Sequence, residues 1–246
     1  MKYISFIKDI CLGGCLVAGF FSSAAFAAPS PGAVQGVVEL FTSQGCSSCP
    51  PADRLLTAMS RKADTITLTF AINYWDYIGW KDTLAAPEFT ARQRAYAATR
   101  GDHVYTPEAV VDGMFDAVGS DKDAIERAIA EGLSNTHALS VPAYLHEENG
   151  VLEIDIGRGT GSAGVYVLRV AKSRSVEISR GENSGHQVTY TNVVRAIRKI
   201  GDWTGAPLKL KLMELRADDE GYVVLLQRGS EDRPGAILAA AKSGGL

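Results

Sequence analysis

The sequence predicts a mixed α/β fold for residues 34–137, followed by a smaller, mainly antiparallel and sandwich-like β domain over residues 138–242. In the first part, β-branched apolar runs at residues 35–42 and 65–72 flank a segment whose apolar residues recur at helical spacing. A strand, a helix and a strand in this order form a unit whose two strands are usually parallel. In the second part, short strand-like runs are separated by Gly, Asn, Asp or Ser, which is typical of antiparallel sheets.

Local signals predict the other elements of the first part. Pro87 suits the first turn of a helix that ends near Gly101. Two short apolar runs around Asp112-Gly113 predict a β-hairpin. Ser120 and Asp123 form a predicted capping pair for a further helix. The resulting order of strand, helix, strand, helix, strand, strand, helix is that of the thioredoxin fold.

The second part contains five strand-like runs, at residues 151–156, 165–171, 176–179, 208–215 and 222–227. The pattern over residues 193–200 fits a short helix or another strand equally well. Residues 159–164 match the G-x-G-x-x-G pattern of dinucleotide sites, but such a site requires a helix next. Because the following residues are strand-like, we interpret this segment as a hairpin loop and predict no cofactor.

The N-terminus has the pattern of a secretory signal peptide. Lys2 and Lys8 precede an apolar stretch over residues 10–21, and Ala25-Phe26-Ala27 is an Ala-x-Ala cleavage pattern. We therefore predict that residues 1–27 are a signal peptide cleaved near Ala27, which places the protein in the periplasm or outside the cell.

An alternative is lipidation at Cys15, because residues 12–15 look like a lipoprotein box, although the apolar run continues past this cysteine. No later stretch approaches the ~20 apolar residues of a membrane-spanning helix, so we predict no membrane span. The net charge is −3 and the charged residues are dispersed, which argues against nucleic-acid binding.

Cys46 and Cys49 are the only cysteines beyond the first fifteen residues, and they lie where a predicted strand meets a predicted helix. A helix N-terminus favours the thiolate, which is the reactive form of cysteine. We therefore expect Cys46 to be a solvent-open nucleophile and Cys49 to be the resolving thiol. Pro50 and Pro51 suit a first helical turn, or they shift the helix start to Pro51 and leave both thiols in the loop.

Two other interpretations of the cysteine pair remain open. The first is a static disulfide, although so short a loop adds little stability to a chain of 246 residues. The second is a copper or zinc carrier, although none of the histidines has zinc-ligand spacing with the pair. These histidines are His103, His137, His146 and His186. We predict no bound metal.

Thr106-Pro107 and Glu39 are further candidate site residues. If the bond before Pro107 is cis, the Thr106 backbone can face the cysteines and receive an extended substrate segment; the alternative is an ordinary trans turn proline. Glu39 lies inside an apolar run, where burial would raise its pKa and let it exchange protons with Cys49. The alternative is that Glu39 faces solvent or caps a loop.

An aromatic stretch at residues 74–80 is a candidate wall of a substrate groove. Its candidate binding residues are Tyr74, Trp75 and Trp80, and the alternative is that these side chains cover a core. Candidate polar anchors near this stretch are Asp76, Lys81, Asp82, Arg92 and Gln93.

The chain resembles the DUF1223 family of exported bacterial proteins. The segments that carry the resemblance are residues 38–53, 74–82, 90–93, 104–107 and 180–183. The resemblance implies a thioredoxin-like domain followed by a β-rich domain, in a family whose biochemical role is unassigned. Thioredoxin-like function carries over only at Cys46, Cys49 and Pro107. Asn73 stands where the pattern leads us to expect an acidic residue, so it receives no role.

These observations predict an exported thiol–disulfide oxidoreductase that acts on a protein or small-molecule thiol or disulfide. The alternative is a non-enzymatic module of the cell envelope that binds a peptide or protein and contains a structural disulfide. The alternative predicts an inaccessible Cys46. The sequence leaves open whether the chemistry is oxidation, reduction or isomerisation, and it does not identify the substrate or the oligomeric state.

Overall fold

The computed structural model describes Met1 and residues 33–134, 138–214 and 216–246. The predicted signal peptide and Cys15 lie outside the described residues. Gly32–Leu246 form one compact unit. Its elements are, in chain order, β1 (Gly36–Thr42), α1 (Pro50–Met59), β2 (Thr65–Ala71), the 3-10 helix η1 (Asp76–Ile78), α2 (Pro87–Arg100), β3 (Glu108–Val111), β4 (Phe115–Val118), α3 (Lys122–Ser134), β5 (Ala143–Glu148), β6 (Val151–Ile156), β7 (Ala163–Glu177), β8 (Gln187–Trp203), β9 (Leu208–Met213), β10 (Glu220–Ser230) and β11 (Arg233–Lys242).

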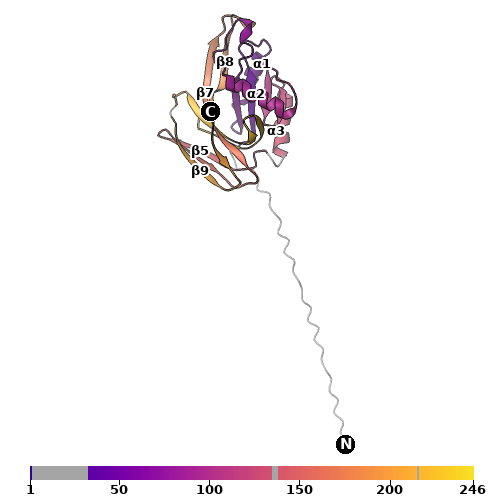
Figure 1. The fold of residues 1–246 in the computed structure, drawn as a ribbon, viewed down its shortest axis with the longest axis vertical. Helices are drawn as coiled ribbons and strands as arrows, with labels where there is room; N and C mark the ends of the chain where they lie inside the picture. The colour runs from indigo at the N-terminus through magenta and orange to yellow at the C-terminus, as the bar shows by residue number, and fades with distance from the viewer. Residues whose placement is uncertain (2–32, 135–137, 215) are drawn as a thin grey trace. The chain divides into compact units, whose positions relative to one another are not determined.

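A large mixed sheet dominates this unit (Figure 1). Its eight strands follow the order β11-β10-β7-β8-β2-β1-β3-β4, and β5, β6 and β9 form a separate antiparallel sheet. As predicted, β1 and β2 are parallel, with Gly36 opposite Thr65 and Thr42 opposite Ala71. The predicted mixed α/β class is confirmed. Among the described residues, no helix is both long and apolar enough to cross a bilayer.

The large sheet contains strands from both sides of the predicted boundary at residues 137 and 138. Thr69 of β2 pairs in parallel with Val193 of β8, and the Thr69 hydroxyl donates to the carbonyl oxygen of Thr191 at 2.7 Å. Strands of the two predicted domains are therefore hydrogen-bonded to each other. The division into two domains stays a prediction.

The side chains of β1 alternate between two cores, because successive residues of a strand point to opposite faces. Val38 and Leu40 pack with residues of α1 and α3. Val37 and Phe41 pack with Phe89 of α2 and with apolar residues of β7 and β10. Helix α2 therefore contacts a core to which distant parts of the large sheet contribute.

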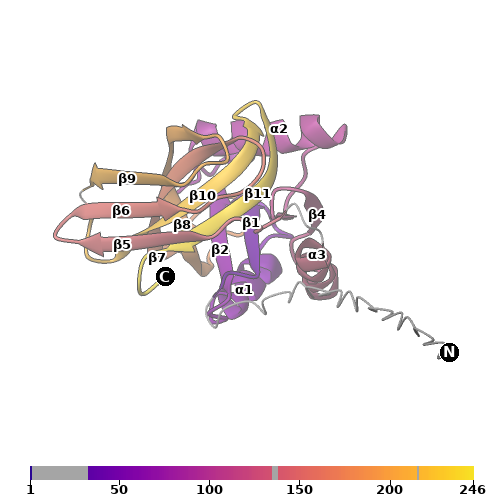
Figure 2. The ribbon, with the colours of Figure 1, turned by 90° about the horizontal axis from the view of Figure 1, so that it is seen from below.

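A third core lies between the small sheet and the large one. Leu152 and Ile154 of β6 pack with Val165 of β7 and Val224 of β10. Figure 2 shows β5, β6 and β9 side by side. On β9, three leucines alternate with more exposed residues, as the sequence pattern predicts.

Several predicted boundaries are confirmed. Helix α2 begins at Pro87, and Gly101 ends it in the left-handed region with φ 81°. The hairpin of β3 and β4 turns at Asp112 and Gly113, which have φ values of 51° and 71°. The predicted capping pair of α3 was wrong. Asp121 directly precedes this helix, and its Oδ1 accepts from the Ala124 backbone N–H at 2.9 Å.

The second half differs from prediction in three ways. The separate runs at 165–171 and 176–179 are largely joined in the long strand β7. The undecided segment 193–200 belongs to strand β8. The glycine-rich segment 159–164 is followed by a strand, but it leads from the small sheet into the large one and is not a hairpin loop.

Candidate functional site

Cys46 and Cys49 form a disulfide directly before α1, with their Cα atoms 5.4 Å apart. The helix begins at Pro50, and Cys49 occupies its N-cap position. Two turn-type hydrogen bonds shape the preceding loop, from Cys46 N to Ser43 O at 3.1 Å and from Cys49 N to Cys46 O at 3.2 Å. Both sulfurs thus precede the first helical residue, and Cys46 lies about one turn before it.

Both cysteines are fully buried, with 0% of either residue exposed. The prediction that Cys46 is open to solvent was therefore wrong. One cause is the segment between β2 and α2, which packs against the cysteine loop. A Cβ placed on Gly45 would lie 3.0 Å from Ile78 Cδ1 and 3.1 Å from Trp75 Cβ.

The loop between β7 and β8, residues 178–186, also covers the cysteine loop, and we call it the covering loop. The side-chain amide of Asn183 donates to the carbonyl oxygens of Gln44 and Cys46, both at 2.9 Å. Gly181 adopts φ +79°, and a Cβ there would lie 3.3 Å from Ile78. Sequence reasoning assigned no role to Asn183, which was noted only as part of the segment 180–183.

The Thr106–Pro107 peptide bond is cis, and it lies beside the disulfide. Ser48 links the two features, because its Oγ is 3.4 Å from Cys46 Sγ and donates to the carbonyl oxygen of Thr106 at 3.4 Å. Trp75 Nε1 donates to the Thr106 hydroxyl at 2.7 Å. The structure therefore brings five predicted site residues together, namely Cys46, Cys49, Thr106, Pro107 and Trp75.

The other predicted aromatic residues have different environments. Trp80 Nε1 donates to Oε1 of the buried Gln44 at 2.8 Å, so Trp80 also adjoins the cysteine loop. Tyr74 packs on the core that contains α2. Tyr77 is 79% exposed and stacks on Trp75 with ring centroids 6.2 Å apart. A half-buried aromatic ring, Trp75, therefore lies next to Thr106, and the exposed ring of Tyr77 stacks on it.

Glu39 lies in a buried ion pair. Arg92 Nε donates to Glu39 Oε1 at 2.8 Å, and Arg92 Nη2 donates to Oε2 at 3.1 Å. The Tyr96 hydroxyl also donates to Glu39, and Gln227 of β10 bonds both Arg92 and Tyr96. Glu39 faces α2, whereas Thr42, three residues along β1, bonds to Asp53 of α1. The contacts of Glu39 are therefore those of a core ion pair.

Two buried aspartates also belong to the surroundings of the cysteine loop. Asp82 Oδ2 accepts from the Gln44 backbone N–H at 2.8 Å, and burial raises the pKa of Asp82. Asp53 Oδ1 accepts from the Thr42 hydroxyl at 2.8 Å, and burial raises the pKa of Asp53 to about 7. Sequence reasoning missed Asp53, although its place four residues after Cys49 was a usable signal.

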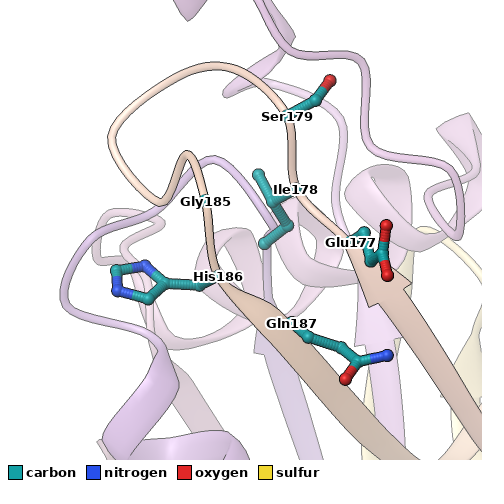
Figure 3. A pocket seen from close by; sticks show the side chains of 6 residues that line it. All are labelled: Glu177, Ile178, Ser179, Gly185, His186 and Gln187. Carbon is teal, nitrogen blue, oxygen red and sulfur yellow. The ribbon is translucent and has the colours of Figure 1, made fainter.

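A hollow of about 280 Å³ lies at the base of the covering loop (Figure 3). Its lining consists of Glu177, Ile178, Ser179, Gly185, His186 and Gln187, so it does not open onto the disulfide. Across the described part of the chain, no group of three or more His, Cys, Asp or Glu side chains is placed to hold a metal ion. The hydrogen-bonded cysteine loop, rather than this hollow, is the candidate site.

Comparisons with known proteins place the chain in a family. The model of the family described as "Protein of unknown function (DUF1223)" matches residues 37–227. A crystal structure of an Agrobacterium tumefaciens protein, a structural genomics target, has a TM-score of 0.79 at 36% identity and covers 87% of this chain and 95% of that chain.

HBP35 of Porphyromonas gingivalis has a TM-score of 0.59 at 13% identity, over 87% of this chain and 76% of that chain. At this identity the likeness concerns the fold alone. A search of curated proteins finds no match. The family match and the Agrobacterium relative together show that the chain belongs to the DUF1223 family.

Proposed function

We propose that the protein is an exported thiol–disulfide oxidoreductase with a thioredoxin-like domain over residues 34–137. The observation that carries this proposal is the Cys46–Cys49 disulfide directly before α1, which Ser48 connects to the Thr106 carbonyl beside the cis Pro107. The element order β1-α1-β2-α2-β3-β4-α3 supports the thioredoxin-like assignment. The signal-like N-terminus supports a periplasmic or secreted location, where disulfides persist.

The proposed reaction uses both sulfurs. The Cys46 thiolate attacks a substrate disulfide, forming one mixed disulfide bond and releasing one substrate thiolate with the bonding electron pair. The Cys49 thiolate then attacks Cys46 Sγ, which closes the internal disulfide and releases the second substrate thiolate. The substrate gains two electrons that the cysteine pair loses, and the reverse sequence oxidises a dithiol.

Thr106 and Trp75 are the proposed substrate contacts. The cis bond and the Ser48 contact lie next to the reacting sulfur, and Trp75 with the exposed Tyr77 offers an aromatic surface for a peptide. Glu39 has no part in this proposal, because Arg92 and Tyr96 already bond its carboxylate oxygens.

The burial of Cys46 requires part of its cover to move before a substrate can react, and this cover includes the covering loop and the segment between β2 and α2. Two hydrogen bonds from Asn183 connect the covering loop to the cysteine loop. Each such bond contributes about 1 kcal/mol net, so transient opening is within thermal reach. The covering loop would thus contribute to the control of access to the sulfur.

The same burial favours a second candidate function. A sealed disulfide suits a non-enzymatic module that binds a peptide or envelope protein, because a structural disulfide resists reduction. In that case the disulfide would hold the loop in shape, and the exposed Tyr77 with the half-buried Trp75 would bind the partner.

Thiol trapping distinguishes the two functions. The background carries Cys11→Ser and Cys15→Ser, so that only the pair can react. In this background an enzyme with Cys49→Ser should accumulate mixed disulfides through Cys46, and Cys46→Ala should abolish reduction of a low-molecular-weight disulfide. Equal activity in the parent and the Cys46→Ala variant would rule out the proposed oxidoreductase function.

A further inference from the structure

Asp53 is a buried carboxyl group with an unpartnered oxygen. The residue is 4% exposed, Thr42 bonds its Oδ1, and its Oδ2 has no hydrogen-bond partner among the described residues. A buried acceptor without a partner is costly, so most such atoms are satisfied in folded proteins. The lack of a partner therefore favours a protonated oxygen, or a role for this oxygen when the disulfide is open.

The position of Asp53 places it one helical turn after Cys49, on the same side of α1. Asp53 lies four residues after Cys49, and its backbone N–H donates to the Cys49 carbonyl oxygen at 3.1 Å. Cys49 itself has helical backbone angles, φ −78° and ψ −35°. Residues four apart share a helix face, and helical side chains lean toward the N-terminus. The Asp53 carboxyl group thus lies on the Cys49 side of α1.

The surroundings of Asp53 suit a group that changes its protonation state near neutral pH. Burial and, to a smaller extent, the charge of Asp82 raise the pKa of Asp53, whereas the Thr42 hydrogen bond and Arg54 lower it, and together they place it at about 7. Tyr190 of β8 also faces both aspartates, and burial together with their charges raises its pKa. A carboxyl group in this range both accepts and donates a proton at neutral pH.

We infer that Asp53 exchanges a proton with Cys49 whenever the disulfide opens or closes. The inference rests on the proposed function and adds a residue to it. During closure, the Asp53 carboxylate takes the proton from the Cys49 thiol, and the resulting thiolate attacks Cys46 Sγ in the mixed disulfide. The Cys46–Cys49 bond forms, and the substrate sulfur leaves as a thiolate with the electron pair. During opening, protonated Asp53 returns its proton to the departing Cys49 sulfur.

Ellman's reagent, an aromatic disulfide, measures this step directly. The reduced full chain with Cys11→Ser and Cys15→Ser should release one chromophoric thiolate when Cys46 reacts and a second when Cys49 closes the internal disulfide. In the parent, the rate of the second release should rise with pH through a group near pH 7. In Asp53→Asn, this rate should fall roughly 100-fold at pH 7. It should then rise only as the Cys49 thiol itself ionises, at about pH 8.5 or above.

Asp112→Asn is the matched control. Asp112 is fully buried, its Oδ2 is also unpartnered, and burial raises its pKa to about 7 as well. It bonds Val37 near the start of β1, whereas Asp53 bonds Thr42 at the end of that strand. Asp112→Asn should therefore leave both release rates and their pH profiles unchanged.

Thr42→Val supplies a second test that does not depend on the folding of Asp53→Asn. It removes the hydrogen bond that lowers the Asp53 pKa, so the pH midpoint of the second release should move upward. A purely structural role for Asp53 predicts no such shift.

Parent-like second release in Asp53→Asn, or an unmoved midpoint in Thr42→Val, would overturn the inference and leave the proposed function standing. A folded parent that releases no chromophore would overturn the proposed function itself.

Discussion

The side-chain amide of Asn183 donates to the carbonyl oxygen of Cys46 at 2.9 Å, although 137 positions separate the two residues. This bond and its partner to Gln44 tie the covering loop to the cysteine loop. Because Cys46 is fully buried, any reagent that reaches its sulfur must first displace part of this cover. Access to the disulfide is therefore a property of contacts between distant parts of the chain.

Asn183→Ala should make the disulfide easier to reduce. Loss of two hydrogen bonds, each worth about 1 kcal/mol, should speed reduction by dithiothreitol by roughly tenfold or more. The rate is measured by quenching samples with iodoacetamide and determining the mass of the alkylated protein by mass spectrometry. Ser184→Ala is the control, because the Ser184 hydroxyl donates only within the covering loop, to Ser179. Equal rates for Asn183→Ala and the parent would show that this amide does not hold the cover closed.

Glu39→Gln should destabilise the fold while leaving the thiol chemistry unchanged. The substitution leaves Arg92 buried without its counter-charge, which typically costs about 3–5 kcal/mol. Urea denaturation measures the loss. Glu126→Gln is the control, because Glu126 pairs with Lys62 at the surface and its loss should hardly matter. A stable Glu39→Gln variant with an altered thiol pH profile would instead support a proton-transfer role for Glu39.

Asp112 should make the protein less stable as the pH rises from about 4 to about 7. Its folded-state pKa is raised from 3.8 to about 7 by burial, so the folded state binds more protons than the unfolded state in this interval. The contribution to stability is therefore complete below the unfolded pKa and is lost as the pH passes through the folded one. Between about pH 4 and about pH 7 the resulting fall in the free energy of unfolding is on the order of a few kcal/mol. Urea titrations of Asp112→Asn should show that this fall is lost. An unchanged slope would contradict this assignment.

Gly113→Ala should be strongly destabilising. Gly113 has φ +71°, and an added Cβ would lie 2.3 Å from the carbonyl oxygen of Gly235. The left-handed conformation and the steric overlap together should cost roughly 3 kcal/mol. Gly244→Ala is the control, since a Cβ there meets nothing within 4 Å. Thermal unfolding compares the two variants, and similar melting temperatures would refute the prediction.

The sequence predicted most local features of the first half. Helical periodicity, the Pro87 start, the Gly101 stop and the Asp112-Gly113 turn are all encoded by residues close together in the chain. The sequence also predicted that Thr106 and Trp75 lie near Cys46, because the cysteine pair and Pro107 each have a recognisable local pattern.

What the sequence did not reveal depends on partners far away. The burial of Cys46 involves Asn183, and the ion pair of Glu39 needs Arg92, 53 positions later. The local sequence around Asn183 or Arg92 does not predict which residue it contacts. Likewise, hydrophobic periodicity predicts that a segment such as β2 is a strand but does not predict that it pairs with β8.

The junction of β2 with β8 has a practical consequence for anyone who shortens this protein. Every residue from Thr65 to Ala71 is buried, and β8 occupies one side of that strand. A fragment that stops at residue 137 would lack β8 and leave this edge of β2 unpaired, and an unpaired strand edge recruits strands from other molecules. Such a fragment should aggregate, so biochemical experiments should use the full-length polypeptide.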